Sequence, residues 1–393
     1  MTHASTGPLS GVLVADFSRI LAGPDATMLM ADLGADVIKV ESPDGDDTRT
    51  WVPPTRDGVS TYYLSINRNK RSIALDLRDP GDLDVARDIA RRADVMIENF
   101  RPGGLAKYGL DYDAVAVDNP GLIYASISGF GSGGGAHLPG YDLLVQAMSG
   151  LMSLTGSPDG PPYRAGISVF DVMTGMHALI GILAALRERD HSGQGQRVEV
   201  NLLSSALSGL VNQTGAYAAG GVVPHRMGNA HPSLFPYEPL PAADGDIIVI
   251  AGNDRQFRTL CTALAAPELA DDPRFRTVGD RTANREELRP LLEKQLSQRT
   301  KAEWFDILID AGVPAGPINS VAEGVRFAEG LGLEPVVEVG SDEDAIPLVR
   351  NPIRFSRSSL RYELAPPEIG EHTEEVLDWL RGTTEDAGKE AQR

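Results

Sequence analysis

Two aspartates stand where a carboxylate could attack a substrate. Asp171 follows the strand-like stretch Gly166–Phe170 and starts the longest apolar helix that the sequence predicts, and Asp142 follows Pro139-Gly-Tyr. The amides and dipole of a helix N-terminus favour the ionised form of such an acid. A carboxylate placed in this way can act as a covalent nucleophile. It can equally be a plain helix cap, and the residues alone leave both interpretations open.

Basic residues in the first third of the chain could hold an anionic ligand. Arg19 lies in the loop Ser18–Pro24, ahead of a predicted helix whose N-terminal amides face that loop. The segment Asn67–Ser72 carries three cations in four positions. Further cations follow at Arg78, Arg101 and Lys107. Positive charge gathered in an acidic protein suits a polyanion such as a nucleotide with phosphates. A solvated charged surface is the alternative.

Other familiar binding motifs are incomplete. Gly129–Gly134 matches G-x-G-x-x-G, but Pro139 prevents the helix that a dinucleotide site needs, so we expect no NAD site. No two histidines stand at metal-ligand spacing, and His372 lacks the H-E-x-x-H pattern, so no metal is expected. The single cysteine, Cys261, excludes an intrachain disulfide and is predicted to be a buried thiol.

Strands and helices alternate along the first 220 residues. The apolar runs predict strands at 12–17, 36–41, 73–77, 95–98, 122–126 and 198–201. Helices are predicted at 25–33, 81–93, 142–151 and 171–187. This order predicts an α/β fold with a parallel sheet and helices on both of its faces. The helix at 171–187 is apolar nearly all round and is expected to be buried.

A break marked by Gly220, Gly221 and Pro224 predicts a domain boundary. Residues 225–330 then read as a smaller α/β unit. It has a strand at 247–251, a helix capped by Asn253, and amphipathic helices at 285–296 and 302–311. Short strands and a helix at about 372–380 follow.

Composition narrows the class of protein. The chain has 393 residues, with 36 basic and 55 acidic side chains and a net charge of −19, which argues against a nucleic-acid-binding surface. Residues 1–9 lack the pattern of a secretory signal peptide. The apolar stretch 172–186 is interrupted by Thr174 and His177 and is too short to span a bilayer. We therefore expect a cytoplasmic protein that binds no membrane.

The order of these motifs resembles the class III CoA-transferases, the CaiB/BaiF family, over nearly the whole chain. The family includes formyl-CoA, carnitine-CoA and succinate–hydroxymethylglutarate CoA-transferases and the α-methylacyl-CoA racemases. The segments that carry the resemblance are Asp16–Pro24, Leu33–Glu41, Asn69–Ser72, Glu98–Gly103, Pro139–Asp142, Asp171–Gly175, Gly193–Val198, Gly252–Phe257 and Gly370–Thr373.

The resemblance implies a fold and an assembly. A Rossmann-like large domain would be formed by residues 1–220 and by 331–393, which return to it, and residues 225–330 would form the smaller domain. Two ring-like chains would interlock as a homodimer. The substrates would be an acyl-CoA and a carboxylic acid, with coenzyme A as substrate and no prosthetic group.

The resemblance also implies a site, with Asp171 as the nucleophile. The CoA contacts that it implies are Leu21, Ala22, Ser42, Leu75, Arg78, Asn99, Phe100, Arg101, Lys107, Tyr141 and Asp142. Arg19, from the anion-binding loop, is a further candidate. The loop around Gly228, Asn229 and Ala230 resembles the glycine loop that shields the aspartate, and its amides would stabilise oxyanions.

Tyr141 favours CoA transfer over racemisation. The racemases carry Gly-His-Asp where this chain has Gly140-Tyr-Asp142. A tyrosine with a pKa of about 10 is a poor proton acceptor at neutral pH. We therefore expect a transferase that acts through an aspartyl anhydride and an aspartyl-CoA thioester. An α-methylacyl-CoA racemase and a non-catalytic CoA-binding protein are the alternatives.

The substrates are predicted from two segments. Gly228–Tyr237 and Gly252–Phe257 look most like the dicarboxylate-using branch of the family, which favours succinyl-CoA as the donor. Arg164 or Arg226 could pair with a distal carboxylate.

Overall fold

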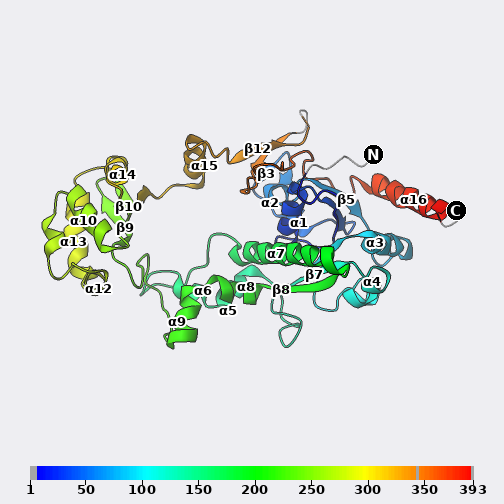
Figure 1. Ribbon diagram of the computed structural model, residues 1–393, viewed down its shortest axis with the longest axis horizontal. Coiled ribbons are helices and arrows are strands. Elements are labelled where there is room, and N and C mark those ends of the chain that lie inside the picture. Colours follow the sequence, from blue (N-terminus) through cyan, green and yellow to red (C-terminus); the bar gives the residue numbers. More distant parts are fainter. Residues whose placement is uncertain (1–6, 342–344, 391–393) are drawn as a thin grey trace. The chain divides into compact units, whose positions relative to one another are not determined.

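The computed structural model describes residues 7–341 and 345–390 (Figure 1). Residues 1–6, which belong to the segment examined for a signal peptide, lie outside the described residues. The chain divides into two compact units. The first unit takes the described residues of 1–150, 165–222 and 334–393, and the second takes 151–164 and 223–333.

The first unit is built on a six-stranded sheet. Its strand order is β5-β2-β1-β6-β7-β8, and every neighbouring pair is parallel, which confirms the predicted parallel α/β architecture. The strands are β1 (Leu13–Asp16), β2 (Asp36–Glu41), β5 (Lys70–Ala74), β6 (Val95–Glu98), β7 (Ile123–Ser128) and β8 (Gln196–Asn201). The inner strands β6 and β7 are almost wholly buried because both faces of a parallel sheet are covered, whereas the edge strand β8 is polar and partly exposed.

Helices cover both faces of this sheet. Helices α1 (Ala22–Asp32) and α7 (Val169–Ser192) pack together on one face, and α3 (Pro80–Arg92), α4 (Tyr112–Asp118) and α16 (Thr373–Glu390) lie on the other (Figure 1). The remaining elements of this unit are η1 (Asp47–Thr50), β3 (Thr55–Arg56), β4 (Val59–Ser60), α2 (Thr61–Ser65), η2 (Ala106–Tyr108), α5 (Asp142–Met148), α8 (Leu202–Gly209), α9 (Asn212–Gly220), β12 (Val336–Val339) and β13 (Ile346–Val349).

Helix α7 corrects two expectations from the sequence. It has 24 residues and is long and apolar enough, by length and composition, to cross a membrane, so the expectation that this stretch is too short was wrong. Nor is it buried all round, because Met176 and Ile180 are exposed. Its other side packs on α1, β7 and β8 (Figure 1).

The C-terminal part of the chain seals the edge strand β5. The Arg68 guanidinium donates to the Val349 carbonyl (2.9 Å), and the Asn69 amide N–H donates to the Leu364 carbonyl (2.8 Å). Further along, the His372 N–H donates to the Ser72 carbonyl (2.9 Å). Backbone groups at the end of the sheet are thereby paired by residues some 300 positions away in the sequence.

The second unit has a three-stranded antiparallel sheet in the order β11-β10-β9. Cys261 is fully buried in its core, as predicted, and Asn253 caps α10 by accepting from the Gln256 N–H. Its elements are α6 (Leu151–Leu154), β9 (Tyr237–Ala242), β10 (Gly245–Ile250), α10 (Asp254–Ala263), α11 (Glu268–Asp271), α12 (Val278–Ala283), α13 (Arg285–Leu296), α14 (Lys301–Asp310), β11 (Ala315–Pro317) and α15 (Val321–Gly330).

Candidate active site

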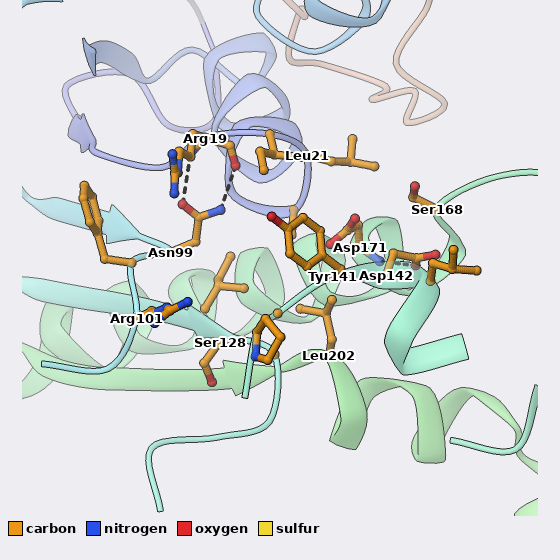
Figure 2. Close-up of a pocket in the computed structure, with 18 of the residues that line it drawn as sticks. Arg19, Leu21, Asn99, Arg101, Ser128, Tyr141, Asp142, Ser168, Asp171 and Leu202 are labelled. Atoms are coloured by element: carbon orange, nitrogen blue, oxygen red, sulfur yellow. Dashed lines mark hydrogen bonds between the residues drawn. The ribbon is translucent and has the colours of Figure 1, made fainter. Parts of the chain in front are cut away.

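A pocket of about 340 Å³ opens in the first unit at the carboxyl ends of β1, β6 and β7. Ligands of open parallel α/β sheets bind at this edge, where the loops that follow the strands converge. The wall is formed mainly by Arg19–Ala22, Asn99–Pro102, Ile127–Gly129, Leu138–Leu143 and Asp171. Figure 2 shows Asp171, Asp142 and Tyr141 gathered together, with Arg19, Asn99 and Arg101 across the pocket.

Asp171 is the third residue of α7, and the N-cap position belongs to Ser168. The interpretation of Asp171 as a plain helix cap was therefore wrong. Its carboxylate accepts no hydrogen bond from the residues that the structure describes. Burial, reinforced by the nearby charge of Asp142, raises the pKa of Asp171 to about 7. A carboxylate without donors, facing a cavity, retains the electron density that a nucleophile needs.

Asp142 supplies the cap that Ser168 does not. One of its oxygens, Oδ1, accepts from the Phe170 N–H (2.8 Å) and from the Asp171 N–H (3.2 Å). The side chain is only 7% exposed and reaches α7 from the first residue of α5. The contact stabilises the first turn of α7 and keeps a negative charge beside Asp171.

The loop that follows β1 is held by hydrogen bonds to its backbone. Asn99 accepts from the Arg19 N–H (3.0 Å) and donates to the Arg19 carbonyl (2.7 Å), as the dashed lines in Figure 2 show. Next to it, Ile20 adopts a left-handed conformation (φ 71°), and its N–H donates to Asp46 at 3.2 Å. The conformation of this pocket wall is therefore fixed by side chains from two other segments.

Two arginines offer positive charge at the pocket. The Arg19 guanidinium pairs with Asp47 at 3.1 Å in an exposed position. The Arg101 guanidinium has no ion-pair partner among the described residues and is exposed. An anionic group of a ligand can therefore pair with Arg101 without displacing a carboxylate.

Comparison with known proteins decides the family. The family model described as CoA-transferase family III matches residues 9–373. The chain belongs to this family.

Relatives of this CoA-transferase span almost its full length. It is 46% identical to a succinate–glutarate CoA-transferase of Agrobacterium fabrum, over 94% of this chain and 95% of that protein. It is 42% identical to an acetyl-CoA:oxalate CoA-transferase of Acetobacter aceti, over 89% and 90%. A crystal structure of a CaiB/BaiF family protein from Brucella suis matches with a TM-score of 0.86 and 43% identity, over 95% of this chain and 100% of that one.

Most of the predicted site residues of the transferase come together in the pocket. Those that line it are Arg19, Leu21, Ala22, Asn99, Phe100, Arg101, Tyr141, Asp142 and Asp171. Four others do not line it. Ser42 is exposed just after β2, and Leu75 is buried in the core of the first unit. Arg78 forms an ion pair with Asp76, and the Lys107 ammonium lies over the Tyr108 ring. The loop with Gly228, Asn229 and Ala230 belongs to the second unit, where the Gly228 N–H donates to the Gly156 carbonyl.

Several pocket residues were not predicted from the sequence, among them Trp51, Tyr62 and Ser168. Trp51 and Tyr62 meet edge to face, with their ring centroids 5.2 Å apart, and Ser168 hydrogen-bonds the Tyr62 side chain. Burial raises the pKa of Tyr62 to about 12, so the phenol stays protonated at neutral pH. For Trp51, the available signal was an aromatic residue just ahead of two prolines in a loop, since binding residues concentrate in loops.

The basic segment Asn67–Ser72 is neither a polyanion site nor a solvated surface, so both interpretations were wrong. The Arg68 guanidinium forms two hydrogen bonds to the buried Asp32 carboxylate, at 2.8 and 2.6 Å. The Lys70 ammonium lies 3.1 Å from the Asp16 carboxylate, and both groups are completely buried. These cations neutralise the carboxylates of Asp16 in β1 and Asp32 in α1. Burial would otherwise disfavour the charged form of these carboxylates.

A second buried ion pair, between Lys39 and Asp46, supports the pocket loop that follows β1. The Lys39 ammonium donates to Asp46 at 3.0 Å, and the same carboxylate accepts from Ile20 and Thr48. Burial by itself raises the pKa of Asp46, but the charge of Lys39 outweighs burial and lowers the pKa below its usual value. Asp46 therefore remains an anion that accepts hydrogen bonds at neutral pH.

Proposed function

We propose that this enzyme moves CoA from succinyl-CoA to a carboxylic acid, with Asp171 as the covalent nucleophile. The observation that carries the proposal is the Asp171 carboxylate, which faces the pocket and accepts no hydrogen bond from a described residue. The pocket lies where parallel α/β sheets bind ligands, and its walls contain most of the CoA contacts that the family resemblance implies.

The reaction proceeds in four transfers. Asp171 attacks the thioester carbonyl, the carbon–sulfur bond breaks, and an aspartyl–succinyl anhydride and CoA thiolate form. The thiolate attacks the aspartyl carbonyl, which releases succinate and leaves an aspartyl-CoA thioester. The acceptor carboxylate attacks that thioester and regenerates thiolate and anhydride. The thiolate then attacks the acceptor acyl group and frees Asp171. No net proton is exchanged, and the bound CoA keeps its thiolate at a high effective concentration.

Short dicarboxylic acids are the acceptor class that we propose. The names of two relatives pair succinate with glutarate or acetyl-CoA with oxalate, and another is a succinyl-CoA:glutarate CoA-transferase of the mouse, 40% identical over 95% of this chain. A second carboxylate needs a cation, and Arg101 in the pocket is without an ion-pair partner among the described residues. Arg164 and Arg226, the candidates from the sequence, belong to the second unit and do not line this pocket.

We further propose an interlocked homodimer located in the cytoplasm. Large apolar side chains are exposed on α5, α7, α8 and α9 of the first unit, which favours their burial by another chain. They include Leu143, Met148, Ile180, Leu207 and Tyr217. The large domain would comprise 1–220 and 331–393, and the small domain 225–330. Light scattering is expected to give twice the 42.0 kDa mass of the chain.

Peptide mass spectrometry tests the covalent step. The protein is incubated with succinyl-CoA and hydroxylamine, and we expect a hydroxamate or a CoA adduct on the Asp171 peptide. Asp171→Asn should lose both the adduct and the turnover. The matched control, Asp118→Asn, alters an exposed carboxylate on α4 and should retain both. Turnover that survives in Asp171→Asn would remove Asp171 from this role. Exchange of an α-proton without acyl exchange would indicate the racemase instead.

A further inference from the structure

Gln146 lies one helical turn after Asp142 on α5 and is completely buried. Its Nε2 donates to Oδ2 of Asp142 and, at 3.1 Å, to the Ile167 carbonyl. Its Oε1 accepts from the Ala165 N–H at 2.8 Å. Both N–H groups and the oxygen of this amide are therefore engaged, as expected of a buried polar side chain with a specific structural role.

These contacts join two parts of the structure that precede the nucleophile. One is the carboxylate of Asp142, whose Oδ1 caps α7 at Phe170 and Asp171 while Gln146 holds its Oδ2. The other is the stretch 165–167, where the chain re-enters the first unit shortly before α7 begins. A single side chain on α5 thus holds both the carboxylate that caps α7 and the stretch 165–167 that precedes α7.

We propose that Gln146 is a positioning residue that orients the Asp171 carboxylate toward the pocket by holding Asp142 and the stretch 165–167. This inference rests on the proposed role of Asp171 as the nucleophile. Gln146 itself does not line the pocket. Its effect is on the geometry of attack, where a displacement of about 1 Å can cost about 100-fold in rate.

The chemistry of the site requires an amide at position 146. Methionine fills a similar volume but leaves the Asp142 carboxylate, the Ile167 carbonyl and the Ala165 N–H without their partner. Glutamate sets a second carboxylate against Asp142 and cannot donate to Ile167 when it is ionised. Each change leaves buried polar groups unsatisfied, and these groups stand next to the nucleophile.

Exchanging the two side-chain types restores most of the hydrogen bonds. In the double variant Asp142→Asn with Gln146→Glu, the oxygen of the new amide still accepts from the first N–H groups of α7, and its NH₂ donates to the introduced carboxylate. The second oxygen of that carboxylate accepts from the Ala165 N–H, so only the Ile167 carbonyl loses a donor. The negative charge also moves one helical turn along α5, away from the first turn of α7.

The experiment compares single-turnover acylation of Asp171 by succinyl-CoA with steady-state kinetics in the full-length variants. We expect Gln146→Met to lower the acylation rate and kcat by about 10- to 100-fold. The KM for succinyl-CoA should stay within about twofold, because Gln146 itself does not line the pocket and most of the candidate CoA contacts that do line it follow β1 and β6. Gln146→Glu should be at least as impaired. The exchanged double variant should recover about tenfold over Gln146→Glu, with the pH midpoint of acylation lowered because the charge is farther from Asp171.

Val145→Ala is the matched control, since Val145 is equally buried on the same helix but contributes only packing. It should lose thermal stability and keep its acylation rate and its pH midpoint. An equal loss of rate in Val145→Ala and Gln146→Met at the same folded fraction would overturn the positioning role. So would a double variant no better than Gln146→Glu. A wild-type enzyme that forms no adduct on Asp171 would instead overturn the proposed function itself.

Discussion

Replacing Asp171 with asparagine should stabilise the folded protein, and the gain should grow with pH. Burial and the charge of Asp142 raise the pKa of Asp171 from 3.8 to about 7. A carboxyl group with a raised pKa favours the folded state when it is protonated. That contribution is complete below the unfolded pKa and is lost as the pH rises through the folded value. The asparagine side chain has no such titration and carries no charge at any pH.

The expected magnitude follows from the pKa difference. Each pKa unit corresponds to 1.36 kcal/mol, so the ionised carboxylate costs the native state about 4 kcal/mol at pH 8. At pH 5, where Asp171 is protonated in the folded protein and mostly ionised in the unfolded chain, the cost is only about 2 kcal/mol. Asp171→Asn should therefore gain about 2 kcal/mol more at pH 8 than at pH 5.

Urea unfolding followed by tryptophan fluorescence measures this difference, at one protein concentration so that self-association is constant. Asp142→Asn is the informative second background, because it removes the neighbouring charge. The extra gain from Asp171→Asn at pH 8 should be smaller there. An increment that is equal at pH 5 and pH 8 would refute the reasoning, because it would mean that Asp171 titrates in the folded protein as it does in the unfolded chain.

Three further outcomes are expected. The single-turnover acylation rate should rise as the pH increases through about 7, because only the ionised Asp171 attacks; a flat profile between pH 6 and 8 would contradict this. Gly175→Ala should lower Tm and raise the KM for CoA thioesters, since the added Cβ would lie 2.5 Å from the Ala22 carbonyl oxygen at the pocket wall, whereas Gly215→Ala on α9 meets no atom within 4 Å and should leave the KM unchanged without lowering Tm. Asn99→Ala should raise that KM by about tenfold in steady-state assays, with kcat at saturation nearly unchanged, because two hydrogen bonds to the pocket loop are lost.

The sequence predicted those elements whose apolar runs are clearly bounded. Strands at 36–41 and 95–98 and the helix at 285–296 appear with the predicted limits, because each begins and ends next to polar or turn-forming residues. Strand β9 was missed, because Pro239 and Pro241 disfavour a strand. Both fit because β9 pairs only with β10 and lies at the edge of its sheet, where a missing N–H is tolerated. Strand β5 begins earlier than predicted, since Lys70 is buried against Asp16.

The site was predictable where a motif marks it and hidden where the fold assembles it. Asp171 and the loop around Arg19 stand out by residue type and position. The cap that Asp142 gives to α7 joins residues 28 and 29 positions apart, and no local pattern signals it. The same holds for Gln146, whose apolar neighbours on α5 make it look like a residue of an ordinary helix.

The late return of the chain to β5 has a consequence for biosynthesis. Every residue that lines the pocket lies before position 203, but the edge of the sheet is sealed only by residues from Val349 onward. At about 5–20 residues per second, a ribosome needs roughly 7 to 30 seconds to make the stretch between them. During that interval the nascent chain presents an unpaired strand edge while the second unit emerges from the exit tunnel. The active-site half of the enzyme is thus synthesised first and completed last, so its maturation has to wait for the end of translation.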